Sequence, residues 1–182
     1  MLLADIDGVI ADCSHRLHFQ KAKDYDAFYS ADNMLRDEVI VKGRDLVRLL
    51  LNTGYAERVD LVLLTGRPNR TRVATEAWLD HNAHIYSFED MIMRHDGDYR
   101  PSNIIKLENF YNWLLEKHVM RSRYNKRELN KFTKLPLEEK VKIMMEYYDE
   151  PVYIDDDPKN VEAIASMFPM MSCLTFGVER FS

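Results

Sequence analysis

Two aspartates near the start of the chain stand one residue apart, directly after the short apolar run Leu2–Ala4. They belong to the segment Asp5-Ile6-Asp7-Gly8-Val9. Residues two apart on an extended chain point the same way, so both carboxylates can face one pocket, and Gly8 allows the chain to turn away. Two close carboxylates repel each other, and a hard cation such as Mg²⁺ would relieve this repulsion. A strand end with two solvated acids explains the pair alone equally well.

A hydroxyl group and an arginine follow a second apolar run, residues 59–64. The segment reads Thr65-Gly66-Arg67-Pro68. Backbone amides at a helix start, together with the Thr65 hydroxyl, can hold phosphate oxygens, and Arg67 could add a charge-assisted bond. The plainer alternative is that Thr65 caps a helix and Gly66 makes the turn. Taken alone, this segment favours the plainer alternative.

A charge-rich segment, residues 94–100, precedes Lys106. Lys106 lies near the start of an amphipathic pattern, where a lone lysine is usually a solvated surface charge. Arg94 and Arg100 could contact a substrate phosphate or pair with the aspartates between them. We favour pairing for these two arginines.

Three consecutive acids follow a third apolar run, in the segment Tyr153-Ile154-Asp155-Asp156-Asp157-Pro158. Asp157 stands directly before Pro158, which suits the first position of a helix. Asp157 is therefore predicted to be the N-cap of that helix. This leaves Asp155 and Asp156 to face a pocket, where a metal ion would offset their charge.

The elements that position these residues alternate between short apolar strands and helices, which is typical of an α/β protein with a buried parallel sheet. Ligands bind beyond the carboxyl ends of the strands in such sheets. Asp5, Thr65 and Asp155 are therefore predicted to meet at one edge. The predicted strands are residues 2–4, 59–64, 85–88, 152–154 and 171–176.

Apolar residues at helical spacing predict five helices. They are residues 46–51 ending at Gly54, residues 73–78 opening near Pro68, residues 104–114, residues 137–148 behind Pro136, and residues 161–168 behind Pro158.

Residues 1–182 are predicted to form a single domain, with two stretches that break this rhythm. Residues 13–42 are polar, aromatic and irregular, and are predicted to form a small cap. Residues 107–149 are predicted to be a helical insert, in which residues 121–134 carry six basic residues against one acid. This basic segment could guide a nucleic-acid strand, but a solvated linker is the favoured interpretation.

Composition limits the classes of partner. The net charge of −5 argues against a broad nucleic-acid-binding face, although not against one strand end held in a pocket. Cys13 and Cys173 are the two cysteines, which favours reduced thiols and a cytoplasmic protein. The sequence predicts no membrane span and no secretory leader, and its oligomeric state stays open.

The four candidate sites, in this order along nearly the whole chain, resemble the signature of the haloacid dehalogenase (HAD) superfamily. Motif one is residues 5–9, motif two is Thr65, motif three is Lys106 and motif four is Asp155-Asp156. The resemblance implies a three-layer Rossmann-like fold, with a central parallel sheet of about five strands, helices on both faces and a small cap.

The same resemblance implies roles for the site residues. Asp5 would attack phosphorus and become an aspartyl phosphate, and Asp7 would protonate the leaving oxygen and then activate water. Thr65 and Lys106 would hold the transferring phosphoryl group.

The resemblance also implies a Mg²⁺ ion bound by Asp5, by the backbone carbonyl of Asp7 and by Asp156 or Asp155. Which of the last two binds the ion directly is left open by the sequence.

A closer resemblance is to the 3′-phosphatase domain of phage-type polynucleotide kinase. It is carried by Asp12, His15-Arg16, residues 64–67, residues 94–101 and residues 154–156. That family tends to have Ser where Thr65 stands and a basic residue where Asp157 stands. The sequence contains no glycine-rich phosphate loop followed by Lys-Ser/Thr, so we expect no kinase half.

Three functions are compatible with these residues. The leading one is a Mg²⁺-dependent phosphomonoesterase for 3′-phosphate ends of nucleic acids or nucleotides. Gly66, Arg67, Arg94 and Arg100 are its candidate substrate-binding residues. The second is a phosphatase of free nucleotides or other small phosphate esters, with residues 13–42 as a lid. The third is a phosphate-binding module without turnover.

Overall fold

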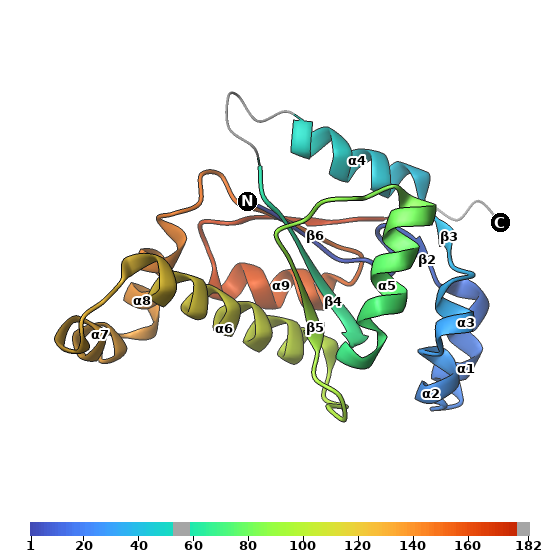
Figure 1. Ribbon diagram of the computed structural model, residues 1–182, viewed down its shortest axis with the longest axis horizontal. Helices are drawn as coiled ribbons and strands as arrows, with labels where there is room; N and C mark the ends of the chain where they lie inside the picture. Colours follow the sequence, from blue (N-terminus) through green and yellow to red (C-terminus); the bar gives the residue numbers. More distant parts are fainter. Residues whose placement is uncertain (53–58, 178–182) are drawn as a thin grey trace.

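A five-stranded parallel sheet forms the centre of the computed structural model, which describes residues 1–52 and 59–177. The strand order is β5-β4-β1-β6-β7, and Figure 1 labels β4, β5 and β6 in the middle of the molecule. The strands are β1 (Leu2–Ala4), β4 (Leu61–Pro68), β5 (Asp90–Arg94), β6 (Val152–Asp155) and β7 (Ser172–Thr175). The predicted α/β fold with a parallel sheet of about five strands is confirmed.

The strand β5 corrects one prediction. Residues 85–88 form no strand, although Ile85 is buried. The edge strand lies at residues 90–94, where three consecutive apolar residues are buried. Tyr86, next to Ile85, is 71% exposed, so residues 85–88 do not form an unbroken buried run. Continuous burial, which a parallel strand requires, therefore selects the later segment.

Successive side chains of each strand point to opposite faces, which divides the apolar core into two layers. Leu3 and Tyr153 pack with one group of helices: α6 (Ser102–Ser122), α8 (Leu137–Met145) and α9 (Pro158–Met167). Leu2 and Ala4 pack on the other face with α4 (Val41–Asn52) and α5 (Arg72–Trp78). Helices cover both faces, as predicted. Gly54, the predicted end of the first helix, lies outside the described residues.

The segment 13–42 forms short elements at one end of the molecule (Figure 1). They are η1 (Ser14–Arg16), α1 (Leu17–Lys21), α2 (Tyr25–Phe28), α3 (Ala31–Met34) and β3 (Glu38–Val39). The strand β3 pairs antiparallel with β2 (Ala11–Asp12), which directly precedes the segment. The remaining short elements are η2 (Asn69–Thr71), η3 (Leu79–Ala83) and α7 (Lys126–Thr133).

The helix α7 lies at the opposite end of the molecule from α1, α2 and α3 (Figure 1). It carries much of the basic segment 121–134. The helix α6 continues unbroken past residue 107, so the helical stretch begins earlier than the predicted insert. In the described ranges, no helix combines the length and apolarity needed to cross a membrane.

Gly43 lets α4 approach the loop that follows β1. A Cβ atom at this position would lie 1.8 Å from the carbonyl oxygen of Val9. The helix and the loop bearing Asp5 and Asp7 can meet this closely only because the side chain is absent.

We predict that Gly43→Ala lowers the free energy of unfolding by about 1–3 kcal/mol, because backbone must shift to admit the methyl group. Urea denaturation measures this difference. Gly177→Ala is the matched control, since among the described residues no atom beyond its chain neighbours lies within 4 Å of its added Cβ. Equal stability of the two variants would contradict the close packing of α4.

Candidate active site

The carboxyl ends of β1, β4 and β6 meet at one edge of the sheet. Ala4 pairs with Leu63 on one side and with Ile154 on the other. The backbone N–H of Asp5 donates to the carbonyl of Ile154 at 2.9 Å. Residues following these strands are therefore neighbours despite their separation in sequence.

Lys106 links two of the acids at this edge. Its Nζ lies 2.7 Å from Oδ2 of Asp5 and 2.6 Å from Oδ2 of Asp155. Only 1% of the Lys106 side chain is exposed, so the expectation for a lone lysine, a solvated surface charge, is wrong here. Burial lowers the pKa of Lys106, but the two carboxylates outweigh it and raise the pKa above its ordinary value.

Asp5 combines burial with access to a cavity. Burial raises the pKa of its carboxyl well above the ordinary value, and the charges of Asp155 and Asp7 act in the same direction against Lys106. Its Oδ1 accepts a hydrogen bond from the N–H of Ile6 at 2.8 Å. Both oxygens are therefore held in fixed positions.

Asp155 is buried and surrounded by donors. Its carboxylate accepts hydrogen bonds from the Tyr153 hydroxyl, from Nδ2 of Asn160 at 3.0 and 3.1 Å, and from the N–H of Asp157 at 2.9 Å. With Lys106 as a further donor, most of its acceptor capacity is used. The side chain of Asp157 caps α9, accepting from Lys159 N at 2.9 Å, which confirms the predicted N-cap.

Asp156 faces the cavity. Partial burial raises the pKa of its carboxyl to about 6, and the charge of Asp155 adds to the increase. Gly8 lies against it with φ +85°, and a Cβ on Gly8 would be 2.1 Å from Oδ2 of Asp156. The glycine is thus required both for its backbone conformation and for the close approach of the two loops.

Asp5, Asp155 and Asp156 form an acidic cluster suited to a hard cation. Each offers one carboxylate oxygen, and these three oxygens lie within 4.8 Å of one another. Oxygen donors carrying several negative charges fit Mg²⁺, which also retains water ligands. The donor set therefore matches the predicted metal.

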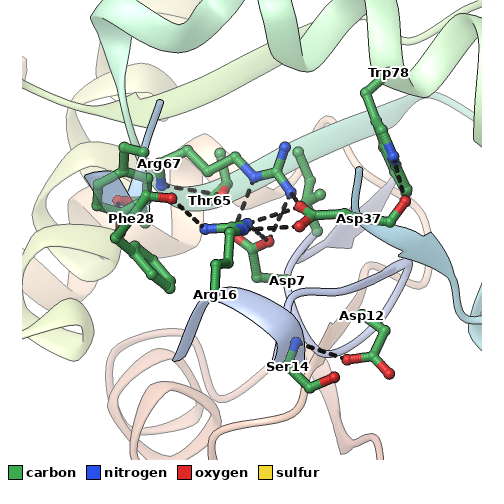
Figure 2. A network of polar contacts seen from close by, with 12 residues as sticks. Asp7, Asp12, Ser14, Arg16, Phe28, Asp37, Thr65, Arg67 and Trp78 are labelled. Atoms are coloured by element: carbon green, nitrogen blue, oxygen red, sulfur yellow. Dashed lines mark hydrogen bonds and ion pairs between the residues drawn. The ribbon is translucent and has the colours of Figure 1, made fainter. Parts of the chain in front are cut away.

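Asp7 belongs to a separate network of arginines (Figure 2). Its carboxylate lies 2.6 Å from Nη2 of Arg67 and 2.7 Å from Nη2 of Arg16. Asp37 binds both arginines at 2.8 Å. Burial raises the pKa of Asp7, but Arg67 and Arg16 outweigh it and hold the pKa below its ordinary value.

Arg67 has no surface left for a substrate. Its residue exposure is 0%, and its guanidinium is directed at Asp7 and Asp37 (Figure 2). The guanidinium carbon also lies 5.8 Å from the ring centroid of Trp78, whose Nε1 donates to the Asp37 carbonyl at 2.8 Å. This geometry fits a residue that positions Asp7 and does not fit the predicted contact with phosphate.

Sequence reasoning missed Asp37. Its side chain is fully buried between Arg16 and Arg67, and Nε2 of His15 lies 3.0 Å away. No spacing signal separates it from the other aspartates of residues 13–42, because its partners come from distant segments. The need for a second carboxylate becomes evident only once the structure shows that Arg16 and Arg67 are both buried.

Thr65 and Gly66 occupy the end of β4. The Thr65 hydroxyl accepts from the N–H of Arg67 at 3.2 Å and is buried. Gly66 lines the cavity, and its carbonyl accepts from Nε of Arg94 at 2.9 Å and from the hydroxyl of Tyr29 at 3.2 Å.

Of the two other predicted arginines, one reaches the cavity and one does not. Arg94 lines it and donates Nη1 to the carbonyls of Asp98 and Arg100 at 2.9 Å each. Arg100 lies outside it and pairs with Asp98 and Glu108 at 2.8 Å each. Pairing, the alternative favoured by the sequence, is confirmed for Arg100.

The cavity at this edge has a volume of about 690 Å³. The predicted site residues that line it are Asp5, Asp7, Gly66, Arg94, Lys106 and Asp156, and Leu17, Gln20, Phe28 and Tyr29 of the segment 13–42 also line it. None of residues 121–134 lines it. The solvated interpretation of the basic segment agrees with this position.

The family described as the polynucleotide kinase PNKP phosphatase domain matches residues 1–131. The chain belongs to this family. It is therefore a PNKP-type phosphatase of the HAD superfamily. No curated protein matches the chain.

Two solved structures have the fold of this PNKP-type phosphatase. They are described as the structure of the Pnkp1/Rnl/Hen1 RNA repair complex and the structure of the Pnkp1/Rnl/Hen1 complex. Each matches with a TM-score of 0.58 and 19% identity over 99% of this chain. The match spans 43% and 46% of those chains, less than half their length.

We predict that Asp37→Ala lowers the free energy of unfolding by about 3–5 kcal/mol, because it leaves buried arginine charge with only one carboxylate. Asp45→Ala, which removes a half-exposed partner of Arg44, should change it by less than about 1 kcal/mol. Urea denaturation of both variants measures the difference. Similar losses in the two variants would show that Asp37 does not hold the network together.

Proposed function

We propose that the chain is a Mg²⁺-dependent phosphomonoesterase that forms an aspartyl phosphate on Asp5 and acts on 3′-phosphate ends of nucleic acids or nucleotides. One observation carries the proposal. Asp5 lines a cavity, Nζ of Lys106 lies 2.7 Å from its carboxylate, and its oxygens belong to the acidic cluster with Asp155 and Asp156.

Asp5 is the proposed nucleophile. A carboxylate is a weak nucleophile and repels a phosphate dianion, so neighbouring cations must reduce that repulsion. Lys106 supplies one positive charge at this position, and the fixed oxygens of Asp5 lessen the reorganisation needed for attack. In the first step an Asp5 oxygen bonds to phosphorus while the ester P–O bond breaks.

Asp7 is the proposed acid and base. It gives a proton to the leaving oxygen, then takes one from the water that attacks phosphorus and releases phosphate from Asp5. Arg16 and Arg67 orient its carboxylate and favour the ionised form, which suits the second step. The negative charge of a bound phosphate would raise its pKa and so favour the protonated form in the first step.

Asp5 and Asp156 are the proposed direct carboxylate ligands of Mg²⁺, with the backbone carbonyl of Asp7 as the further ligand that the family resemblance implies. Asp155 is already satisfied by protein donors, and its part is to hold Lys106 behind the site. Bound Mg²⁺ would neutralise charge on the phosphoryl oxygens.

Substrate binding is assigned to residues at the end of β4 and β5. Thr65 and the Gly66 backbone would hold phosphate oxygens together with Lys106, and Arg94 would contact the substrate next to this position. We propose residues 13–42 as the small cap, since seven of these residues line the cavity.

We predict that Asp5→Asn lowers kcat for 3′-phosphate release by at least about 10³-fold, as expected when a nucleophile is lost. The assay compares 3′- and 5′-phosphorylated oligonucleotides, mononucleotides and sugar phosphates, each with Mg²⁺ or with chelator. Asp45→Asn should match the wild type. Near-full activity of Asp5→Asn would rule out its role as nucleophile.

The same panel separates the alternatives. Preference for mononucleotides or sugar phosphates would support a small-ester phosphatase. Phosphate binding without release from any substrate would support a non-catalytic module.

We predict that Asp156→Asn weakens Mg²⁺ binding at least about tenfold, because even residues behind a metal ligand have effects of that size. Isothermal calorimetry and the Mg²⁺ dependence of activity measure the change. Asp80→Asn, whose side chain is half exposed, is the control. Unchanged affinity in Asp156→Asn would place the ion elsewhere.

A further inference from the structure

A second hollow, of about 250 Å³, adjoins the proposed active site. Four residues line both hollows: Gln20, Tyr29, Arg94 and Ser102. A ligand can therefore extend from Asp5 past Arg94 without leaving the protein surface. Neither the proposed chemistry nor the metal site uses this second hollow.

Two tyrosines from distant segments line it. Tyr25 begins α2, Tyr99 lies in the loop after β5, and their ring centroids are 5.9 Å apart. Tyr99 is 73% exposed and Tyr25 is 37% exposed. These rings offer π faces, and planar aromatic ligands stack on such surfaces.

Arg70 ties both tyrosine-bearing segments to the body of the protein. Its Nη2 lies 3.0 Å from Oδ1 of Asp26, next to Tyr25, and its backbone N–H donates to Oδ1 of Asp96 at 2.9 Å. Arg94 braces the same loop through its hydrogen bonds to the carbonyls of Asp98 and Arg100, the two residues that flank Tyr99. The walls are therefore in place before a ligand arrives, which lowers the entropy lost on binding.

The charges of the second hollow favour a neutral planar group. Arg70 and Arg100 are each neutralised by a carboxylate. Arg94, at the junction, forms no ion pair among the residues the structure describes, and its Nη2 has no hydrogen-bond partner there. From Asp5 outward, the surface therefore presents the proposed phosphate site, then the unpaired Arg94, then the Tyr25–Tyr99 pair. This order matches the alternation of phosphate and base along a nucleic-acid strand.

We propose that the hollow lined by Tyr25 and Tyr99 binds, by stacking, the base of the nucleotide preceding the 3′-terminal one in a single-stranded substrate. Arg94 contacts the phosphodiester between those two nucleotides. This inference rests on the proposed function, because it takes Asp5 as the place of the 3′-phosphate. A single strand is required since paired bases have no free face for an aromatic side chain, and any of the bases can stack.

The test compares KM for a 3′-phosphorylated tetranucleotide and a nucleoside 3′-monophosphate, with ribose and deoxyribose forms in separate arms. Tyr99→Ala should raise KM for the tetranucleotide about tenfold, the effect expected for one stacked base, and leave the monophosphate unchanged. Tyr99→Phe should behave as the wild type, because the ring is retained. Tyr86→Ala is the matched control, since Tyr86 is 71% exposed and lines neither hollow.

A tetranucleotide with an abasic residue next to its 3′-terminal nucleotide identifies the base concerned. It should bind the wild type about tenfold more weakly, and Tyr99→Ala should add no further loss. Equal KM values for wild type and Tyr99→Ala would overturn the inference, as would an equal loss with the monophosphate.

Fluorescence anisotropy with a labelled 3′-hydroxyl tetranucleotide tests the inference separately from turnover. Weaker binding by Tyr99→Ala supports the stacking site even if the wild type releases no phosphate, an outcome that would refute the proposed function alone. Unchanged binding by Tyr99→Ala, or no binding by the wild type, overturns the stacking site.

Discussion

The burial of negative charge at the carboxyl edge of the sheet depends on Lys106. Asp5 follows β1 and Asp155 ends the adjacent strand β6. Two buried carboxylates so close would repel each other and favour protonation. The ammonium group between them makes the ionised pair compatible with a buried position. Asp156 and the cavity lie next to these ion pairs. The same ion pairs hold Asp5 at the edge of the cavity.

Two aspartates two residues apart thus acquire opposite properties. Burial and neighbouring acids raise the pKa of Asp5, while Arg16 and Arg67 hold the pKa of Asp7 down. In the proposed mechanism Asp5 must be ionised to attack phosphorus, so Lys106 and a bound Mg²⁺ would have to offset the rise in its pKa. Asp37 completes the arrangement by neutralising the excess charge of the arginines, so a residue outside the cavity helps to set the chemistry within it.

The sequence predicted those parts of the site that lie directly after apolar strands. The runs before Asp5 and Asp155 are strong local signals, and parallel topology brings their ends together. Local signals failed where tertiary packing decides. The edge strand lies at residues 90–94 because burial on both faces, and not local apolarity alone, defines it. Asp37 and the inward orientation of Arg67 depend on contacts between distant segments, which no spacing encodes.

The most direct test is to locate the phosphoryl group during turnover. A substrate carrying a radiolabelled 3′-phosphate is mixed with enzyme and Mg²⁺, quenched in acid within milliseconds, and the protein is digested for peptide mapping. The account predicts label on the N-terminal peptide containing Asp5. Rapid phosphate release with label on another peptide, or with none on the protein at any time, would contradict it.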